Sequence, residues 1–418
     1  MRPTVARMPT RYNSRMDKPT SDRPEASFRS LLQGDYPAVK EIIAASFIQA
    51  VQSNPKALDL LEQEPWYDTA HMSVAEVDGE VVSCMGVRTG SLSFSGVGIP
   101  AGLVGTVCTA PRLRGRGIGS MLMWAAIEKM QQSGLILSYL HTSEDRAGFY
   151  SRLGYRKAIS ENPLLLLSLD GYGSMSGPES IPVHPGSGAD AEDCHRIYDA
   201  FYGRINGSWS RTLAFWERRL QGRPKLFGPG AMSFRLVGRR PALAYVAFLE
   251  SPDAGTVSEW ACLPGQEDAA MQLLHSLLRD WRDRGIESAR LQISSRHALR
   301  PLLRDTGVED ATGHGEVWLR CHDSSRCLDL IRPVLAERAS VAGLEARIRV
   351  RDSSTTLNVG RGEPLQLEAD ASDLCCLIYN GRRLPGLIGE GSITASDCEK
   401  MALLFPETGA TRCAQDAY

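Results

Sequence analysis

The sequence lacks several features that assign proteins to special classes. Its ten cysteines include no C-x-x-C pair, and neither the spacing of Cys321 and Cys327 nor the adjacent Cys375 and Cys376 resembles a zinc site or a disulfide framework. We therefore expect no metal, and we expect reduced, mostly buried thiols, which suit a cytoplasmic protein. No stretch reaches the roughly 18 to 20 apolar residues that a membrane span needs, so no membrane partner is expected.

Strong net charge and unusual composition are absent as well. The formal net charge is -2 over 418 residues, which gives no global field that would attract nucleic acid. The hydrophobic fraction of 43% and the charged fraction of 23% are those of ordinary globular proteins. A chain of this length exceeds the size at which one hydrophobic core stops growing, so two or three domains are expected.

Residues 1–26 form a segment unlike the rest. They are rich in Arg, Pro, Ser and Thr and contain no apolar core, so they do not resemble a secretory signal. A disordered leader is the expected state. Met8 and Met16 are alternative starts, and the sequence leaves the true start open.

Residues 27–170 are predicted to form a compact α/β domain with a mixed sheet. Apolar residues from Tyr36 to Phe47 recur at helical spacing, and the dipeptide Asp78-Gly79 separates two alternating segments, which predicts a hairpin. The further expected elements are a strand at 101–109, a helix at 118–132, a strand at 136–142, a short helix at 146–152 and a last strand at 164–169.

A cluster of Gly, Ser and Pro at 171–188 predicts a linker. The second domain, 171–325, begins with this linker and then repeats the order of helices and strands. Where the first domain has RLRGRGIGS, the second has PGQEDAAM, so we expect a degenerate copy. The third domain, 326–418, is predicted to pack helices on a small antiparallel sheet. The overall expectation is two tandem α/β units followed by an α+β domain.

The segment RLRGRGIG has the pattern R-x-x-G-x-G and lies between a predicted strand and a predicted helix. Backbone N–H groups that are unobstructed at Gly115, Gly117 and Gly119 form an anion pocket at a helix N-terminus. Arg114 and Arg116 add charge-assisted hydrogen bonds, so a pyrophosphate is the natural occupant. The segment has neither the G-x-G-x-x-G pattern of dinucleotide sites nor the G-K-[ST] pattern of nucleoside triphosphate sites, so neither kind of ligand is indicated. The alternative is a tight turn that only closes the helix.

Together with GFYSRLGY, this segment resembles the GCN5-related N-acetyltransferase (GNAT) superfamily. In that superfamily the acetyl-coenzyme A loop reads R/Q-x-x-G-x-G/A, and a later helix carries a tyrosine before G-[YF], as Tyr150, Gly154 and Tyr155 do here. The resemblance implies that acetyl-CoA is the cosubstrate and that Tyr150 lies beside its sulfur. The cofactor-binding residues that it implies are Val107, Cys108, Thr109, Arg114, Gly115, Arg116, Gly117, Ile118, Gly119, Ser120 and Ser143.

The order of domains narrows the resemblance. A chain of this length with an active acetyltransferase domain, a second without the coenzyme loop and a third similar to sterol carrier proteins resembles the Eis (enhanced intracellular survival) family of aminoglycoside N-acetyltransferases. T-x-S-E before the tyrosine motif, with Ser143 and Glu144, and the ending LFPETGATRCAQDAY resemble that family. Two features depart from it, because the loop is richer in glycine and Tyr418 stands where the family has Phe.

The Eis resemblance implies a mechanism and an assembly. Tyr150 is the implied general acid, and the terminal carboxylate of Tyr418 is the implied general base that takes a proton from the amine. The alternative role of Tyr150 is packing, and that of Tyr418 is a frayed chain end. The family also implies a homo-hexamer built from trimers.

The acetyl acceptor is expected to be an amine of a polycationic small molecule such as an aminoglycoside. Other amines stay open, namely a peptide antibiotic, a natural-product intermediate or a protein lysine. An alternative from another functional class is a lipid-binding protein in which the transferase loop is vestigial. No motif identifies the residues of the amine pocket. The alternative for each candidate is a surface or packing role. The candidates are Phe47, Glu64, Trp66, Asp68, Glu407 and Asp416.

Overall fold

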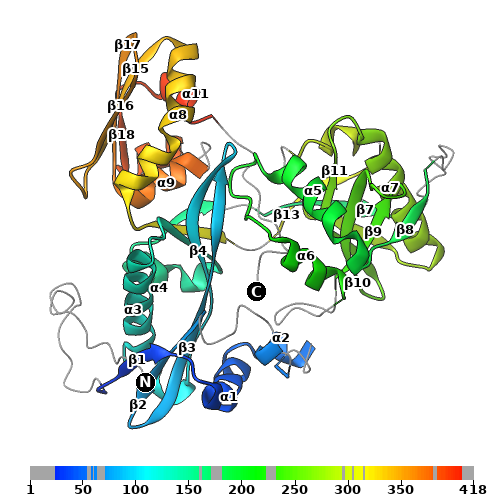
Figure 1. The fold of residues 1–418 in the computed structure, drawn as a ribbon, viewed down its shortest axis with the longest axis horizontal. Helices are drawn as coiled ribbons and strands as arrows, with labels where there is room; N and C mark the ends of the chain where they lie inside the picture. Colours follow the sequence, from blue (N-terminus) through cyan, green and yellow to red (C-terminus); the bar gives the residue numbers. More distant parts are fainter. Residues whose placement is uncertain are drawn as a thin grey trace.

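The computed structural model describes residues 24–53, 58–59, 61–63, 71–159, 162–170, 181–222, 232–293, 297–303, 306–313, 316–379 and 384–406. Across these residues the predicted mixed α/β architecture is confirmed: helices pack on two seven-stranded sheets and one four-stranded sheet. Figure 1 shows the three sheets in three parts of the molecule, the second at the right and the third at the upper left.

The first sheet has the strand order β1-β2-β3-β4-β5-β14-β6. Its strands are β1 (Ser27–Ser30), β2 (Met72–Val77), β3 (Glu80–Phe94), β4 (Val97–Thr109), β5 (Leu137–Thr142), β6 (Arg156–Ile159) and β14 (Glu316–Cys321). The helices that accompany it are α1 (Tyr36–Ser46), α2 (Ile48–Ser53), α3 (Ile118–Gln132) and α4 (Ala147–Arg152). The predicted helices and the predicted hairpin are confirmed, with Asp78 and Gly79 both at positive φ.

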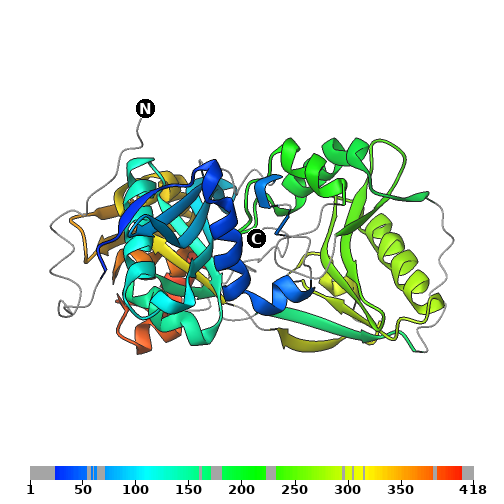
Figure 2. The ribbon, with the colours of Figure 1, turned by 90° about the horizontal axis from the view of Figure 1, so that it is seen from below.

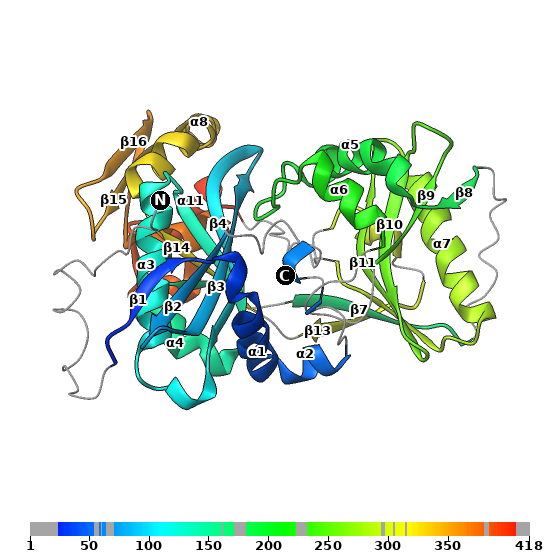
Figure 3. The ribbon, with the colours of Figure 1, turned by 60° about the horizontal axis from the view of Figure 1, so that its bottom comes forward.

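Helices α1 and α3 cover opposite faces of the first sheet. Ile118 and Leu122 of α3 pack in one apolar cluster with Val104, whereas Val39 of α1 packs in another with Cys108. Val104 and Cys108 are four residues apart and would face the same side of a regular strand, so the bulge between them, with Thr106 at positive φ, turns them to opposite faces. Figures 2 and 3 show α1 and α2 on the side of the first sheet that faces the second sheet.

A long hairpin that the sequence pattern did not predict extends the first sheet. β3 and β4 pair from Phe94 opposite Val97 back to Ser83 opposite Thr109, and the turn Ser95-Gly96 has positive φ at both residues. Its tip contacts both other parts. The Ser93 N–H donates to the Ser208 carbonyl over 2.9 Å, and Arg338 donates to Ser95 Oγ over 2.8 Å.

The second sheet has the order β13-β7-β12-β11-β10-β9-β8. Its strands are β7 (Asn162–Ser168), β8 (Val183–Pro185), β9 (Ser233–Val237), β10 (Ala244–Glu250), β11 (Ala254–Cys262), β12 (Ser288–Leu291) and β13 (Glu309–Gly313). α5 (Ala191–Tyr202) and α6 (Leu213–Leu220) pack on one face, and α7 (Glu267–Asp283) packs on the other. These helices match the predicted repeat.

Two strands are exchanged between the sheets. The strand predicted at 164–169 exists as β7, but it pairs with β12 and β13 of the second sheet, although the boundary at residue 170 assigned it to the first domain. In return, β14 lies between β5 and β6 of the first sheet. Periodicity predicts that a strand forms but not which neighbours pair with it, so only tertiary packing decides the exchange.

The C-terminal part, residues 324–379 and 384–406, holds the third sheet, with the order β16-β15-β17-β18. Its elements are α8 (Ser324–Ala342), β15 (Leu344–Val350), β16 (Thr356–Gly360), β17 (Glu363–Ala369), α9 (Ala371–Tyr379), α10 (Leu384–Gly389), β18 (Ile393–Ala395) and α11 (Cys398–Leu404). The predicted antiparallel sheet is wrong in one pairing, because β15 and β17 are parallel. β16 forms a hairpin on one side of β15, which leaves β17 to pair on the other side.

Candidate active site

The glycine-rich loop connects β4 to α3. After β4 ends at Thr109, Gly115 and Gly117 take φ values of 78° and 83°, and α3 begins at Ile118. Glycine adopts this left-handed backbone conformation readily, whereas a residue with a Cβ is strained in it. A Cβ on Gly115 would meet no atom within 4 Å, so backbone conformation and not space requires that glycine.

The N-terminus of α3 can accept an anion. Gly117 is its N-cap residue, and no side chain caps the helix. The first N–H groups of a 15-residue helix are therefore left for a ligand, and the helix dipole favours negative charge there. A Cβ on Gly119 would lie 3.1 Å from Thr109 Oγ1, so glycine keeps the helix close to β4. These features fit a pyrophosphate.

The two arginines of the loop differ. Arg114 Nε donates to the Thr109 carbonyl over 3.0 Å, and its Nη2 donates to Ser46 Oγ over 2.9 Å and to the Ala45 carbonyl over 3.3 Å. Arg114 therefore braces the loop against the end of α1. Arg116 is exposed, and no hydrogen bond or ion pair joins it to another residue of the described chain. Its charge is available to a ligand.

β4 and β5 diverge beside the loop. They pair in parallel only from Ala101 to Val104, although β4 continues to Thr109. A bulge interrupts the pairing of β3 with β4, and Thr106 takes a positive φ of 55° there. The Ala110 N–H donates to the Val82 carbonyl of β3, so by alternation the backbone groups of Thr109 point away from β3, towards the opening.

Tyr150 lies on α4, partly buried among aromatic rings. Its ring centroid is 4.9 Å from that of Phe149 and 6.0 Å from that of Tyr155. Burial raises the pKa of Tyr150 well above its usual value, and the nearby Tyr155 and Cys108 raise it further. The phenol is therefore protonated at neutral pH and holds a proton that it can donate.

Tyr155 is the structural partner of Tyr150. It is fully buried, and its hydroxyl lies 2.7 Å from Ser138 Oγ on β5. Burial raises the pKa of Tyr155 to about 12. Because its hydroxyl already has a partner inside the core, Tyr155 positions the ring of Tyr150 and does not face a ligand.

The exchanged strand β14 supports the end of α4. Gly154 has a φ of 84°, and a Cβ there would collide with the guanidinium of Arg320. That guanidinium donates to the Leu153 carbonyl over 2.5 Å and lies 5.1 Å from the ring centroid of Trp124 on α3. The glycine of the sequence motif therefore makes room for an arginine from a distant part of the chain, and the hydrogen bond joins residues 167 positions apart.

The other predicted residues lie in different settings. Cys108 and Ile118 are buried in the core, so only their backbones can face a ligand, whereas Val107 and Ser120 are partly exposed. Ser143 is exposed, and its hydroxyl donates to Asp145. Phe47 packs against the apolar cluster of α1. The predictions on Tyr418, Glu64, Trp66, Asp68, Glu407 and Asp416 lie outside the described residues.

Ser83 on β3 is a further residue of the site, and the sequence pattern did not predict it. Its side chain is fully buried, and its hydroxyl donates to the Cys108 carbonyl over 2.5 Å and lies 3.0 Å from Thr109 Oγ1. Ser83 thus fixes the last two residues of β4 at the opening. A single serine within an apolar strand carries no signal that would identify it in the sequence.

Residues 27–158 match the family model described as an acetyltransferase (GNAT) domain. The chain carries a GNAT acetyltransferase domain. It follows that the protein is an acyltransferase, and GNAT domains use acetyl-CoA. The glycine loop, the opening beside β4 and Tyr150 all lie within the matched residues. No protein of curated function matches the sequence.

Solved structures share the fold over most of the chain. A GCN5-related N-acetyltransferase from Kribbella flavida superposes with a TM-score of 0.71 at 18% identity and covers 96% of this chain and 100% of its own. One from Anabaena variabilis has a TM-score of 0.71 at 16% identity, with 94% and 100% coverage. Eis1 from Mycobacterium abscessus has a TM-score of 0.66 at 19% identity, with 94% and 100% coverage.

Two kinds of feature are absent from the described residues. No helix there has the length and apolar character that crossing a membrane requires. No group of three or more His, Cys, Asp or Glu side chains in that part of the chain has the geometry of a metal site.

Proposed function

We propose that the protein acetylates an amine of a polycationic small molecule, such as an aminoglycoside, and that Tyr150 is the general acid. The observation that carries this proposal is that one domain combines a protonated, partly buried tyrosine, two parallel strands that separate after Val104 and an uncapped helix N-terminus. The Eis resemblance of the motifs and of the ending supports the choice of acceptor.

Acetyl-CoA would be held by the loop and by the end of β4. The N–H groups at Gly117, Gly119 and Ser120, with the charge of Arg116, would bind its pyrophosphate, and the backbone of Val107 and Thr109 would bind its pantetheine arm. When bound, it supplies the acetyl group as a thioester. Arg114 and Ser83 hold these binding groups in place through the loop and β4.

Two proton transfers complete the proposal. Tyr150 holds a proton at its phenolic oxygen and donates it to the leaving sulfur. The amine arrives as an ammonium and must lose a proton, for which we propose the terminal carboxylate of Tyr418 as the acceptor. A carboxylate with a pKa of about 3.5 is charged at neutral pH and can take that proton through water.

The test is thiol release from acetyl-CoA with a panel of amines: an aminoglycoside, a basic peptide, a simple monoamine and a lysine-rich protein. Acetylation of the aminoglycoside above the others is the expected result. Selective turnover of the peptide or the protein would replace the proposed acceptor. No turnover with any amine, together with tight binding of a fatty acid, would favour the lipid-binding alternative.

The role of the chain end has a separate test. Two residues added after Tyr418 should lower kcat strongly, while the same two residues added before Met1 should not. Full activity of the extended chain would exclude the terminal carboxylate as the base without affecting the proposal for Tyr150. A homo-hexamer is also proposed from the Eis resemblance, and light scattering of the purified protein tests it.

A further inference from the structure

Three thiols from three different elements meet where the first sheet joins the C-terminal part. Cys321 ends β14, Cys327 lies on α8 and Cys375 lies on α9. The sulfurs of Cys327 and Cys375 are 4.0 Å apart, and the side chain of Cys321 hydrogen-bonds with both. This thiol trio therefore connects the acetyltransferase sheet to two helices of the C-terminal part.

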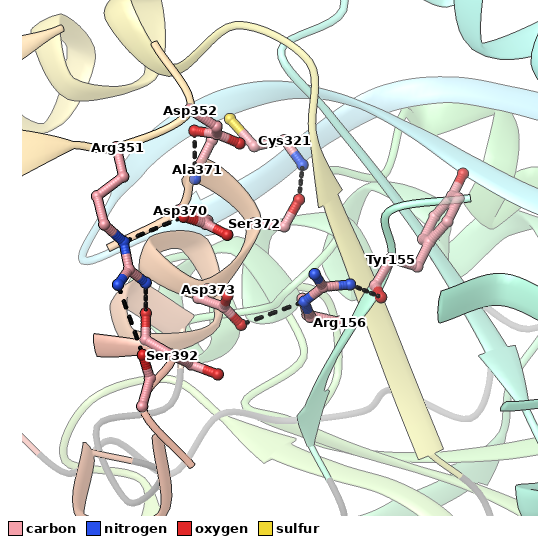
Figure 4. A network of polar contacts seen from close by, with 11 residues as sticks. Tyr155, Arg156, Cys321, Arg351, Asp352, Asp370, Ala371, Ser372, Asp373 and Ser392 are labelled. Atoms are coloured by element: carbon pink, nitrogen blue, oxygen red, sulfur yellow. Dashed lines mark hydrogen bonds and ion pairs between the residues drawn. The ribbon is translucent and has the colours of Figure 1, made fainter. Parts of the chain in front are cut away.

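Polar contacts hold the trio in place. The Cys321 N–H donates to Ser372 Oγ at the start of α9 over 3.2 Å. On the same turn the carboxylate of Asp373 lies 3.5 Å from the guanidinium of Arg156, which follows the motif residue Tyr155. Figure 4 shows Cys321, Ser372, Asp373 and Arg156 between β14 and α9. β14 and α9, which carry Cys321 and Cys375, therefore cannot separate without breaking these contacts.

The three sulfurs are not equivalent. Hydrogen bonds from the other two thiols lower the pKa of Cys321, whereas the pKa values of Cys327 and Cys375 are raised by those bonds and by burial. Cys321 is also the most exposed of the three, at 8% against 2% and 1%. Because the thiolate is the nucleophile in thiol chemistry, Cys321 is the sulfur suited to attack.

We propose that the thiol trio is an oxidation site for a small hydroperoxide, in which Cys321 attacks and a thiol of the C-terminal part completes a disulfide. The Cys321 thiolate attacks one peroxide oxygen, the O–O bond breaks, and sulfenic acid forms as hydroxide leaves. The thiol of Cys327 or Cys375 then attacks that sulfur and expels water. In sum, two thiols and one hydrogen peroxide give one disulfide and two waters. The bridge ties β14 to α8 or α9.

The experiment uses the full chain with Cys398→Ser and Cys413→Ser as background, treated with hydrogen peroxide, alkylated and mapped by mass spectrometry. We expect a loss of 2 Da that dithiothreitol reverses, one peptide pair that links Cys321 to Cys327 or Cys375, and a midpoint of thermal unfolding raised by several degrees. Cys194→Ser, a buried thiol of the second sheet's core, is the matched control and should leave this product unchanged.

Two variants separate the proposal from a structural role of the thiols. Cys321→Ser should abolish the disulfide, and a bridge between Cys327 and Cys375 in that variant would overturn the proposal. In Cys327→Ser/Cys375→Ser, peroxide should leave a sulfenic acid on Cys321 that dimedone labels. Absence of labelling in a variant with a native circular dichroism spectrum would also overturn it.

Discussion

The first and second sheets place the same pair of diverging parallel strands at their centres and fill the space between them differently. β11 pairs with β12 over four residues, Ala254 to Val257, as β4 pairs with β5 over four, and each first strand then continues past a bulge. Beside β4 lie the glycine loop and Tyr150. Beside β11, the ring of Trp260 stacks on that of His297, which follows β12, with centroids 5.9 Å apart.

The second sheet is therefore closed by aromatic side chains where the first is open. Trp260 is fully buried, and its Nε1 donates to the Ala270 carbonyl in the first turns of α7 over 3.0 Å. The helix that follows begins after Gln266 without a glycine run. The comparison teaches that this topology supplies a gap between two strands, and that side chains decide whether a ligand or the protein's own core occupies it.

The largest expected effect tests the chemistry of the open sheet. Tyr150→Phe should lower kcat by about 100-fold or more, within the usual contribution of a general acid, with little change in the KM for acetyl-CoA. Tyr155→Phe, which loses a hydrogen bond in the core, should lower stability but keep most of kcat. Steady-state kinetics on both variants measure the difference. Equal losses of kcat would show that Tyr150 only packs.

Loss of a buried ion pair of the second sheet should lower the free energy of unfolding. Arg211 and Glu259 form an ion pair with side-chain exposures of 0% and 1%, and Tyr245 donates to the same carboxylate over 3.0 Å. Glu259→Gln should lower the free energy of unfolding by about 3 to 5 kcal/mol, because it leaves a guanidinium buried without its counter-charge. Urea unfolding measures this loss, and Glu368→Gln on the exposed face of the third sheet should change it little.

The packing of His297 against Trp260 should also lose its stabilising contribution at low pH. Burial lowers the pKa of His297 to about 4, and its ring accepts from the Leu299 N–H while it lies 3.2 Å from the Tyr202 hydroxyl. The neutral ring is favoured in the folded state, so its contribution is complete above pH 6.5 and is lost as the pH falls towards 4. The loss approaches about 3 kcal/mol.

Thermal unfolding between pH 7 and pH 4.5 tests the role of His297. His297→Gln should flatten the pH dependence of the unfolding midpoint. An unchanged slope in that variant would assign the acid sensitivity to another group, of which His322, also with a lowered pKa, is the first to examine.

A matched pair of glycines tests whether the open loop binds the coenzyme. Gly115 and Gly265 have φ values of 78° and 76°, and a Cβ added to either would meet no atom within 4 Å. Alanine at either site should cost about 1 to 2 kcal/mol of backbone strain. Only Gly115→Ala should raise the KM for acetyl-CoA, by roughly tenfold. A similar rise in Gly265→Ala would place the coenzyme elsewhere.

The smallest effect concerns the exposed arginine. Arg116→Ala should raise the KM for acetyl-CoA about threefold to tenfold, and the difference from the parent should shrink as salt is added, because an exposed charge is screened. Arg112→Ala is the control, since that side chain pairs with Glu80 at 2.5 Å. A salt-independent effect at Arg116 would indicate packing and not charge.

Local features could be predicted from the sequence. Positive φ at Asp78, Gly115 and Gly117, and the ends of α3, follow from short-range rules that depend on a few neighbouring residues. The glycine loop and the tyrosine motif also identify the kind of domain from the order of residues alone. Local backbone preferences and a spacing that matches a known pattern are sufficient for both.

Only the tertiary structure decided which distant residues meet. The exchange of β7 and β14, the support of α4 by Arg320, the thiol trio and the closure of the second sheet by Trp260 and His297 depend on pairing and packing between segments far apart in the chain. The amplitude of hydrophobic alternation is the same whichever sheet a strand joins, so no local pattern records these contacts. The sequence alone thus determined the glycine loop. Packing between distant segments determined that the gap between the parallel strands is filled in the second sheet and left open in the first.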